Sequence, residues 1–124
     1  MSDFAPIPPQ GGLAVSLTLD VRHCLVVGGG EAAAARVRSL LAAGAQVKVV
    51  SPNLVPELVH RAAWGEVAWA ERAFATQDLH ATSLVLVTLN DEGESLRIAA
   101  LARARGILVN LAALPSECDF HLAA

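Results

Sequence analysis

The sequence predicts an α/β fold, a doubly wound parallel sheet with strand order 3-2-1-4-5 in a single domain. Two observations carry this prediction. The apolar run 24–27 leads directly into Gly28-x-Gly30-x-x-Ala33, the glycine spacing of a dinucleotide-binding turn with alanine in the third place. Strand-like and helix-like segments then alternate along the chain. Such alternation produces right-handed crossovers, and with the glycine turn it predicts the Rossmann arrangement.

The first helix is expected over 31–43, where Val37, Leu40 and Leu41 recur at helical spacing and Gly44 is suited to the position after a helix. Segment 83–89 is apolar on both faces, as a central parallel strand must be. The other expected elements are strand 46–50, helix 56–63, strand 66–69, a loop or short helix at 74–80, helix 94–105, strand 107–111, a turn at 115–119 and the start of a sixth strand at 120–122.

Composition restricts the class of protein. The 124 residues are 54% hydrophobic and 17% charged, which favours one compact domain at 13–124 after a disordered, Pro- and Gly-rich leader at 1–12. No apolar run reaches the ~18 residues of a membrane span, and no signal peptide is visible, so a cytoplasmic location is expected. A net charge of −3 without a basic cluster argues against nucleic acid as a partner. Two cysteines make no disulfide framework.

The glycine turn predicts a site for NAD. A glycine at 28 permits a sharp turn off the strand, and one at 30 lets the backbone approach a pyrophosphate. The helix that follows offers unpaired N–H groups to the phosphates. The predicted cofactor-binding residues are Gly28, Gly29, Gly30, Glu31, Ala32, Ser51, Pro52, Thr88 and Asn110. No metal site is predicted, because Cys118 and His121 are too few ligands.

Three of these positions have two interpretations each. Ser51 follows strand 46–50, where many dinucleotide-binding domains carry an acid for the ribose 2′-OH. Ser51 and Asn53 can bond the ribose or can simply form a turn, and the lack of a nearby arginine favours NAD over NADP. Thr88 and Asn110 follow neighbouring strands and predict either a contact with the nicotinamide or ribose, or a capping role.

The remaining polar residues are expected to be structural. Asp91 and Glu92 suit the start of a helix. Arg36 and Arg38 are expected to face solvent on the first helix. Glu117 and Asp119 are expected to decorate a surface turn.

Five stretches together resemble the siroheme synthase family, and more narrowly its NAD-dependent precorrin-2 dehydrogenase and sirohydrochlorin ferrochelatase domain. They are LVVGGGEAAAAR at 25–36, LLAAGAQVKVVSP at 40–52, VTLND at 87–91, ARARGILVN at 102–110 and PSECDF at 115–120. The resemblance implies that a hydride passes from precorrin-2 to NAD⁺ and a proton to a base, giving sirohydrochlorin. It further implies that Fe²⁺ insertion can follow, and that the substrate partner is a tetrapyrrole.

Two departures from the family pattern leave other functions open. The family's catalytic aspartate aligns with Ala113, which can neither take a proton nor bind iron, so no catalytic residue is assigned. The family also continues into a dimerisation and substrate region beyond the position of Ala124. The alternatives are a degenerate NAD(H)-binding module or half of a split enzyme, completed by a homodimer or a partner chain. A third alternative is an NAD-gated regulatory domain of potassium transporters. Such domains normally have an acid at the position of Ser51, so Ser51 argues against this alternative.

Overall fold

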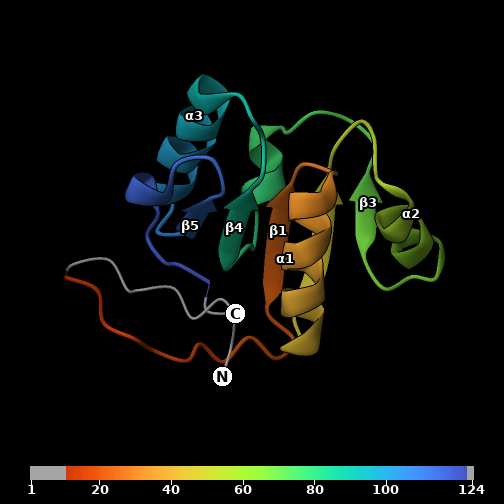
Figure 1. Cartoon of the computed structure of the whole chain (residues 1–124), viewed down its shortest axis with the longest axis horizontal. Coiled ribbons are helices and arrows are strands. Elements are labelled where there is room, and N and C mark those ends of the chain that lie inside the picture. The colour runs from red at the N-terminus through yellow and green to blue at the C-terminus, as the bar shows by residue number, and fades with distance from the viewer. Residues whose placement is uncertain (1–10, 123–124) are drawn as a thin grey trace.

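The computed structural model describes residues 11–122, whose strands form one parallel five-stranded sheet in the order β3-β2-β1-β4-β5 (Figure 1). This order is the predicted one. The strands are β1 His23–Val27, β2 Gln46–Val50, β3 Ala68–Ala70, β4 Leu84–Val87 and β5 Leu108–Leu111. β1 is central and pairs with β2 and β4, so its carboxyl end lies at the point where the chain order of the strands reverses.

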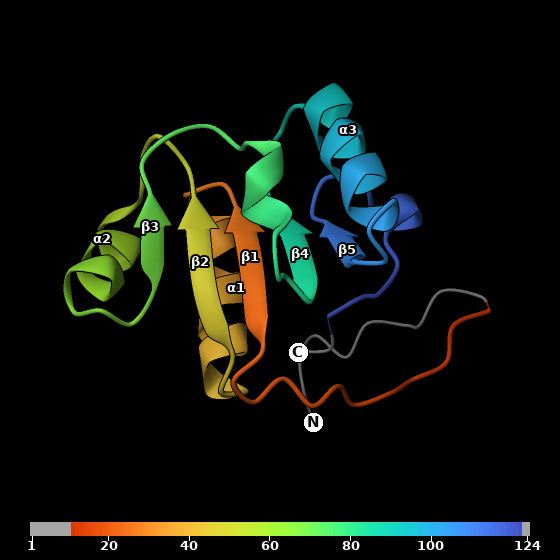
Figure 2. The ribbon, with the colours of Figure 1, turned by 180° about the vertical axis from the view of Figure 1, so that it is seen from behind.

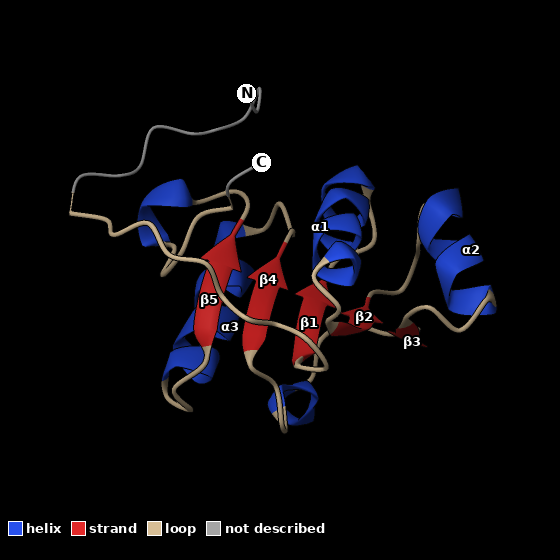
Figure 3. Cartoon of the chain, turned by 90° about the horizontal axis from the view of Figure 1, so that it is seen from below, coloured by secondary structure: helices blue, strands red, loops and turns tan. Residues whose placement is uncertain are grey.

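Helices cover the two faces of the sheet unequally. The helices are α1 Glu31–Ala42, α2 Pro56–Ala63 and α3 Glu92–Arg103, with short 3₁₀ turns η1 at Thr76–Leu79 and η2 at Pro115–Glu117. α1 and α2 pack on one face and α3 packs on the other (Figure 3). Seen from behind, η1 lies near β4, while the β2 and β3 part of that face carries no helix of the described chain (Figure 2).

Alternation along the strands divides the core into two clusters. On the α1 face, Val26 and Leu86 pack with Val37 and Leu58 from the helices. On the α3 face, Leu25, Val27, Val85 and Val109 pack with Ile98. Because successive strand side chains point to opposite faces, a continuous apolar run such as 84–87 fills both clusters.

Two helix boundaries have the local features that the sequence predicts. Gly44 has φ +80° after α1, a conformation that a side chain would strain. Asp91 is the N-cap of α3, where its side chain accepts a hydrogen bond of 3.0 Å from the Glu94 N–H.

Several predicted boundaries need correction. Residues 120–122 form no strand, because the Phe120 carbonyl is held by a side chain from β5 and the segment has no strand partner in the described chain. β3 begins at Ala68, not at the predicted residue 66. α3 begins at Glu92, not at the predicted residue 94, immediately after its Asp91 cap.

The predicted domain limits remain predictions. The leader at 1–12 lies outside the described residues except for Gly11 and Gly12. None of the helices at 11–122 has the length and apolar character needed to cross a membrane.

Candidate dinucleotide site

The first glycine of the turn is required by the fold itself. Gly28 follows β1 with φ +116°, and its N–H donates to the Val50 carbonyl over 3.0 Å. A Cβ at this position would overlap the Thr88 hydroxyl at the end of β4. Backbone conformation and a close neighbour therefore both exclude a side chain at position 28.

The second glycine lets the loop after β2 pack against the turn. The Gly29 carbonyl accepts a 2.8 Å hydrogen bond from the Val55 N–H. A Cβ on Gly29 would overlap the Asn53 carbonyl oxygen and lie 2.9 Å from the Ser51 hydroxyl. Its absence keeps β1 and the β2–α2 loop in contact.

The third glycine has a different environment. Gly30 is exposed and is the N-cap of α1 with φ −91°. No atom of the described residues lies within 4 Å of where its Cβ would stand. The fold does not need glycine here, but a phosphate approaching the backbone would. Among residues 11–122, the N–H groups of Glu31 and Ala32 in the first turn of α1 have no hydrogen-bond acceptor. Open space beside unpaired N–H groups at a helix start fits the pyrophosphate of a dinucleotide.

Ser51 and Pro52 border this turn from the β2 side. The buried Ser51 hydroxyl donates to the Asn53 carbonyl over 2.7 Å and accepts from the Asn53 N–H over 3.4 Å. These bonds shape a local turn, which is one of the two interpretations of Ser51. Pro52 and Asn53 are exposed beside it. The ribose contact stays a prediction.

Thr88 lies at the turn, whereas Asn110 lies farther along the sheet. The Thr88 hydroxyl donates to the Val27 carbonyl over 2.9 Å and joins β4 to the end of β1. Asn110 is in β5, two strands from β1, and only 5% of it is exposed. Its Nδ2 donates to the Phe120 carbonyl over 3.0 Å and lies 3.6 Å from the Cys118 Sγ. A nicotinamide contact by either residue stays a prediction.

The prediction that Arg36 faces solvent is wrong. Its Nε donates to Asn110 Oδ1 over 3.4 Å, and its Nη1 donates to the Ala32 carbonyl over 3.1 Å. Burial lowers the pKa of this half-buried guanidinium. Ala33 and Val37, three residues before it and one after, are both buried. That spacing was the available sequence signal that Arg36 borders the packed face of α1.

The turn after β5 is fixed by Cys118 and Asp119. The Cys118 Sγ lies 3.1 Å from the Leu111 N–H and 3.2 Å from the Leu111 carbonyl. The Asp119 carboxylate accepts from the Val109 N–H over 3.0 Å and pairs with Arg103, so it anchors the turn and does not merely decorate it. Ala113 is exposed just past the carboxyl end of β5. Within 11–122, no three His, Cys, Asp or Glu side chains gather as metal ligands.

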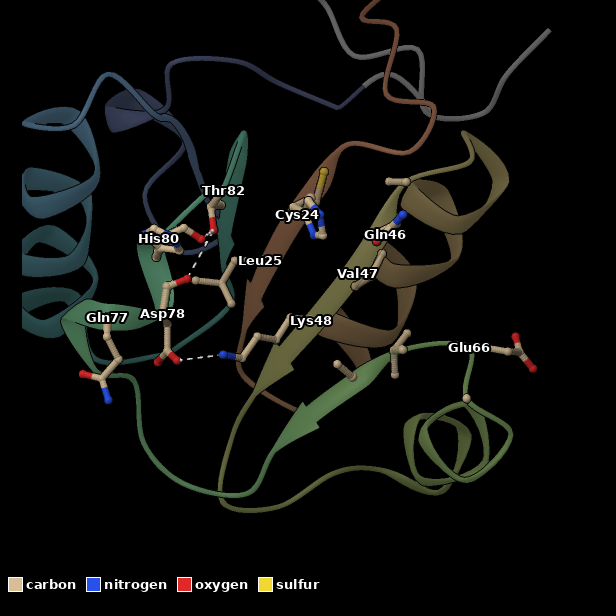
Figure 4. Close-up of a pocket in the computed structure, with 15 residues that line it drawn as sticks. Cys24, Leu25, Gln46, Val47, Lys48, Glu66, Gln77, Asp78, His80 and Thr82 are labelled. Carbon is tan, nitrogen blue, oxygen red and sulfur yellow. Dashed lines mark hydrogen bonds and ion pairs between the residues drawn. The ribbon is translucent and has the colours of Figure 1, made fainter.

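A cavity of about 670 Å³ lies away from the glycine turn (Figure 4). It opens on the sheet face opposite α1, toward the amino ends of β1 and β2, and Lys48, Gln77 and Asp78 line it. The Asp78 side chain has no exposed surface and pairs with Lys48 at 3.1 Å and Arg72 at 2.6 Å. Hydrogen bonds from Arg72 above all, then from the Ala75 N–H and Lys48, hold the pKa of this carboxyl well below its usual range. Sequence reasoning did not identify this structural cluster.

The parallel sheet, the glycine turn at its central strand and the open start of α1 define a dinucleotide-binding domain of the Rossmann type. Residues 15–124 match the family model described as "Putative NAD(P)-binding". The chain belongs to this family and, within it, to the siroheme synthases, as their N-terminal Rossmann domain. The cofactor of this domain is NAD.

Relatives with siroheme-related names cover most of this chain. It is 36% identical over 123 residues to "Siroheme biosynthesis protein met8" of Schizosaccharomyces pombe, covering 97% of this chain and 47% of the relative. It is 36% identical over 110 residues to "Siroheme synthase" of Nitrosococcus oceani, covering 89% and 24%. The solved structure "SirC, precorrin-2 dehydrogenase" superposes with a TM-score of 0.76 and 26% identity, covering 91% of this chain and 55% of that one. The chain thus spans about half or less of these relatives.

Proposed function

We propose that this chain supplies the NAD-binding part of a precorrin-2 dehydrogenase in siroheme biosynthesis. The observation that carries the proposal is the start of α1, where Gly30 leaves space beside unpaired backbone N–H groups. The printed names of the relatives support the choice of substrate. When bound, NAD⁺ supplies a hydride acceptor for the oxidation.

In this proposal, different residues at the carboxyl edge of the sheet contact different parts of the cofactor and substrate. The backbone at Gly28, Gly29, Gly30, Glu31 and Ala32 holds the pyrophosphate. Ser51 and Pro52 border the adenosine ribose. Thr88 and Asn110, on the other side of β1, position the nicotinamide half. The tetrapyrrole then meets the cofactor near the end of β5, where Ala113 is exposed.

Ala113 supports a second candidate, a non-catalytic NAD(H)-binding module or one half of a split enzyme. Oxidation of precorrin-2 releases a proton as well as a hydride. A methyl group cannot accept that proton, and a positioned general base typically contributes ~10²–10⁴-fold to a rate. Glu117 follows in the next turn, but a shift of several residues rarely keeps a base within about 3 Å of its proton.

Replacing Gly30 with valine tests the cofactor site. The side chain would enter the space proposed for the pyrophosphate, so NAD⁺ affinity should fall by at least about 100-fold in calorimetry. Because no atom lies within 4 Å of the added Cβ, folding should survive. Loss of glycine from the N-cap costs about 1 kcal/mol, a fall in Tm of roughly 5 °C. Equal affinity in the two proteins would exclude this turn as the phosphate site.

Ala113→Asp distinguishes the two candidates. A carboxylate at this exposed position should raise NADH formation from precorrin-2 by at least about tenfold, while NAD⁺ affinity stays within about twofold. Ala112→Asp is the matched control, because it adds the same charge one residue earlier. Robust turnover by the wild type that Ala113→Asp leaves unchanged would mean that another residue is the base.

The proposal assigns the rest of the substrate site to a region outside residues 11–122. The relatives are longer than the matched segment, which supports this assignment.

We place the reaction in the cytoplasm, since both cysteines are free thiols. Sedimentation at low micromolar concentration should show mostly monomer. A tight dimer would place an interface within this domain.

A further inference from the structure

Arg36 is a half-buried cation without an acidic partner among residues 11–122. Arg38, Arg61, Arg72, Arg97 and Arg103 all form ion pairs with carboxylates. Among residues 11–122, no such pair involves Arg36, and its hydrogen bonds go to a carbonyl and an amide oxygen. A partly buried charge is costly unless it is paired. The guanidinium is therefore a charge whose partner is not supplied by the described chain.

The direction of the Arg36 side chain leads toward the cofactor edge. Helical side chains lean toward the amino end of their helix. Nη1 of Arg36 accordingly reaches the Ala32 carbonyl, one turn nearer the glycine turn. The guanidinium therefore bridges Ala32, in the first turn of α1, and Asn110 in β5.

Asn110 holds the guanidinium in a defined orientation. Asn110 is buried, and its amide is fixed by the Phe120 carbonyl, so its Oδ1 is a rigid acceptor for Arg36 Nε. A guanidinium has five N–H donors, and only two of them make these bonds. Three donors remain, one on Nη1 and two on Nη2, and they are available to the oxygens of a carboxylate or phosphate.

The position favours a substrate carboxylate over a cofactor phosphate. β5 lies two strands from β1, a separation of about 10 Å at the usual strand spacing. The pyrophosphate is assigned to the glycine turn on β1, which already has its own N–H donors. The exposed turn at Ala113 follows β5 on the side where the substrate would meet the nicotinamide.

We propose that Arg36 binds a carboxylate side chain of the tetrapyrrole substrate and so orients the ring against the nicotinamide. This inference rests on the proposed function for the identity of the substrate, and on the geometry of Arg36 for the carboxylate. Asn110 is a positioning residue in this site. Its amide sets the direction of the guanidinium and does not itself touch the substrate.

The test measures binding of sirohydrochlorin, the polycarboxylate product of the proposed reaction, by anaerobic absorption titration of the full chain in the presence of NAD⁺. Arg36→Gln should weaken sirohydrochlorin binding by about tenfold or more. Arg36→Lys should retain part of the affinity, since it keeps the charge and loses the planar guanidinium. Arg38→Gln is the matched control on the same helix, and should change binding less than about twofold. NAD⁺ affinity should be the same in all four proteins.

A second measurement separates this inference from the proposed function. Propane-1,2,3-tricarboxylate is titrated into ¹⁵N-labelled protein, and the Arg36 Nε–H signal is assigned by its absence in Arg36→Gln. A saturable shift of Arg36 but not of Arg38, without sirohydrochlorin binding, would support a carboxylate site and overturn the tetrapyrrole assignment. No shift with either probe, or equal losses in Arg36→Gln and Arg38→Gln, would overturn the inference.

Discussion

The glycine turn and the Asp78 cluster differ in whether their polar groups have hydrogen-bond partners within the described chain. At the start of α1, backbone N–H groups have no acceptor in the described chain and Gly30 leaves space beside them. Around Asp78, a carboxylate with no exposed surface is bonded by Lys48, Arg72 and a backbone N–H. The cavity of about 670 Å³ lies at the second region, not the first. The proposed function therefore places the ligand where hydrogen-bonding capacity is unmatched, not where the empty volume is.

The same contrast holds between two arginines. Arg72 makes two hydrogen bonds to the Asp78 carboxylate, at 2.8 and 2.6 Å. Arg36 is half-buried at the edge of the sheet and bonds to an amide and a carbonyl. The first arginine completes a structural network, and the second has donors available to a ligand.

The largest expected effect comes from breaking the complete network. Asp78→Asn leaves Arg72 and Lys48 without their carboxylate, and loss of one partner from a buried ion pair costs about 3–5 kcal/mol. Both cations are 41% exposed, so the lower end, about 3 kcal/mol, is expected in urea unfolding. Glu94→Gln, which breaks a surface pair with Arg97, is the control and should cost less than about 0.5 kcal/mol. A loss below about 1 kcal/mol for Asp78→Asn would show that the cluster is not structural.

The Asp78 cluster also predicts a dependence of stability on pH. Its carboxyl pKa is lowered in the folded protein, mainly by Arg72, relative to about 3.9 in the unfolded chain. The unfolded state therefore takes up the proton first on acidification. The stabilisation is fully present above about pH 5 and is lost as the pH falls below 4. Tm measured from pH 7 to 2.5 should fall less steeply for Asp78→Asn than for the wild type, and parallel curves would contradict this assignment.

A smaller effect separates two adjacent glycines. Alanine at position 29 would overlap the Asn53 carbonyl and should cost about 2–3 kcal/mol, the upper part of the range for overpacking. Alanine at position 30 meets no atom within 4 Å and should cost less than about 1 kcal/mol, as an N-cap change. Thermal unfolding of both variants measures the difference. Equal losses would mean that the two positions are not structurally distinct.

The smallest effect concerns Thr88. Thr88→Val removes a hydroxyl that donates to the Val27 carbonyl, which keeps its bond from the Thr88 N–H, so a loss of about 0.5–1 kcal/mol is expected. Thr82→Val, which removes hydroxyl bonds beside Asp78, is the matched variant in the other region. NAD⁺ calorimetry on both adds a second readout. A fall in affinity confined to Thr88→Val would support the predicted nicotinamide contact.

The sequence by itself determined the order of the sheet and the location of the turn. Apolar runs such as 24–27 and 84–87, bounded by turn residues, are typical of buried parallel strands. Gly44 and Asp91 mark helix ends through local conformation and local hydrogen bonds. The glycine spacing also identifies the dinucleotide turn, because the reasons for Gly28 and Gly30 lie in the backbone within a few residues.

Only the tertiary structure decided how distant polar side chains pair. Arg36 and Asn110 are separated by 74 residues, and Lys48 and Asp78 by 30, so neither pair has a local signal. The end of the chain shows the same limit. Phe120 and Leu122 alternate like a strand, but strand formation needs a neighbouring backbone, and the Asn110 side chain bonds the Phe120 carbonyl instead. Periodicity records which residues are buried, whereas the partner of each polar group depends on the packing of elements far apart in the sequence.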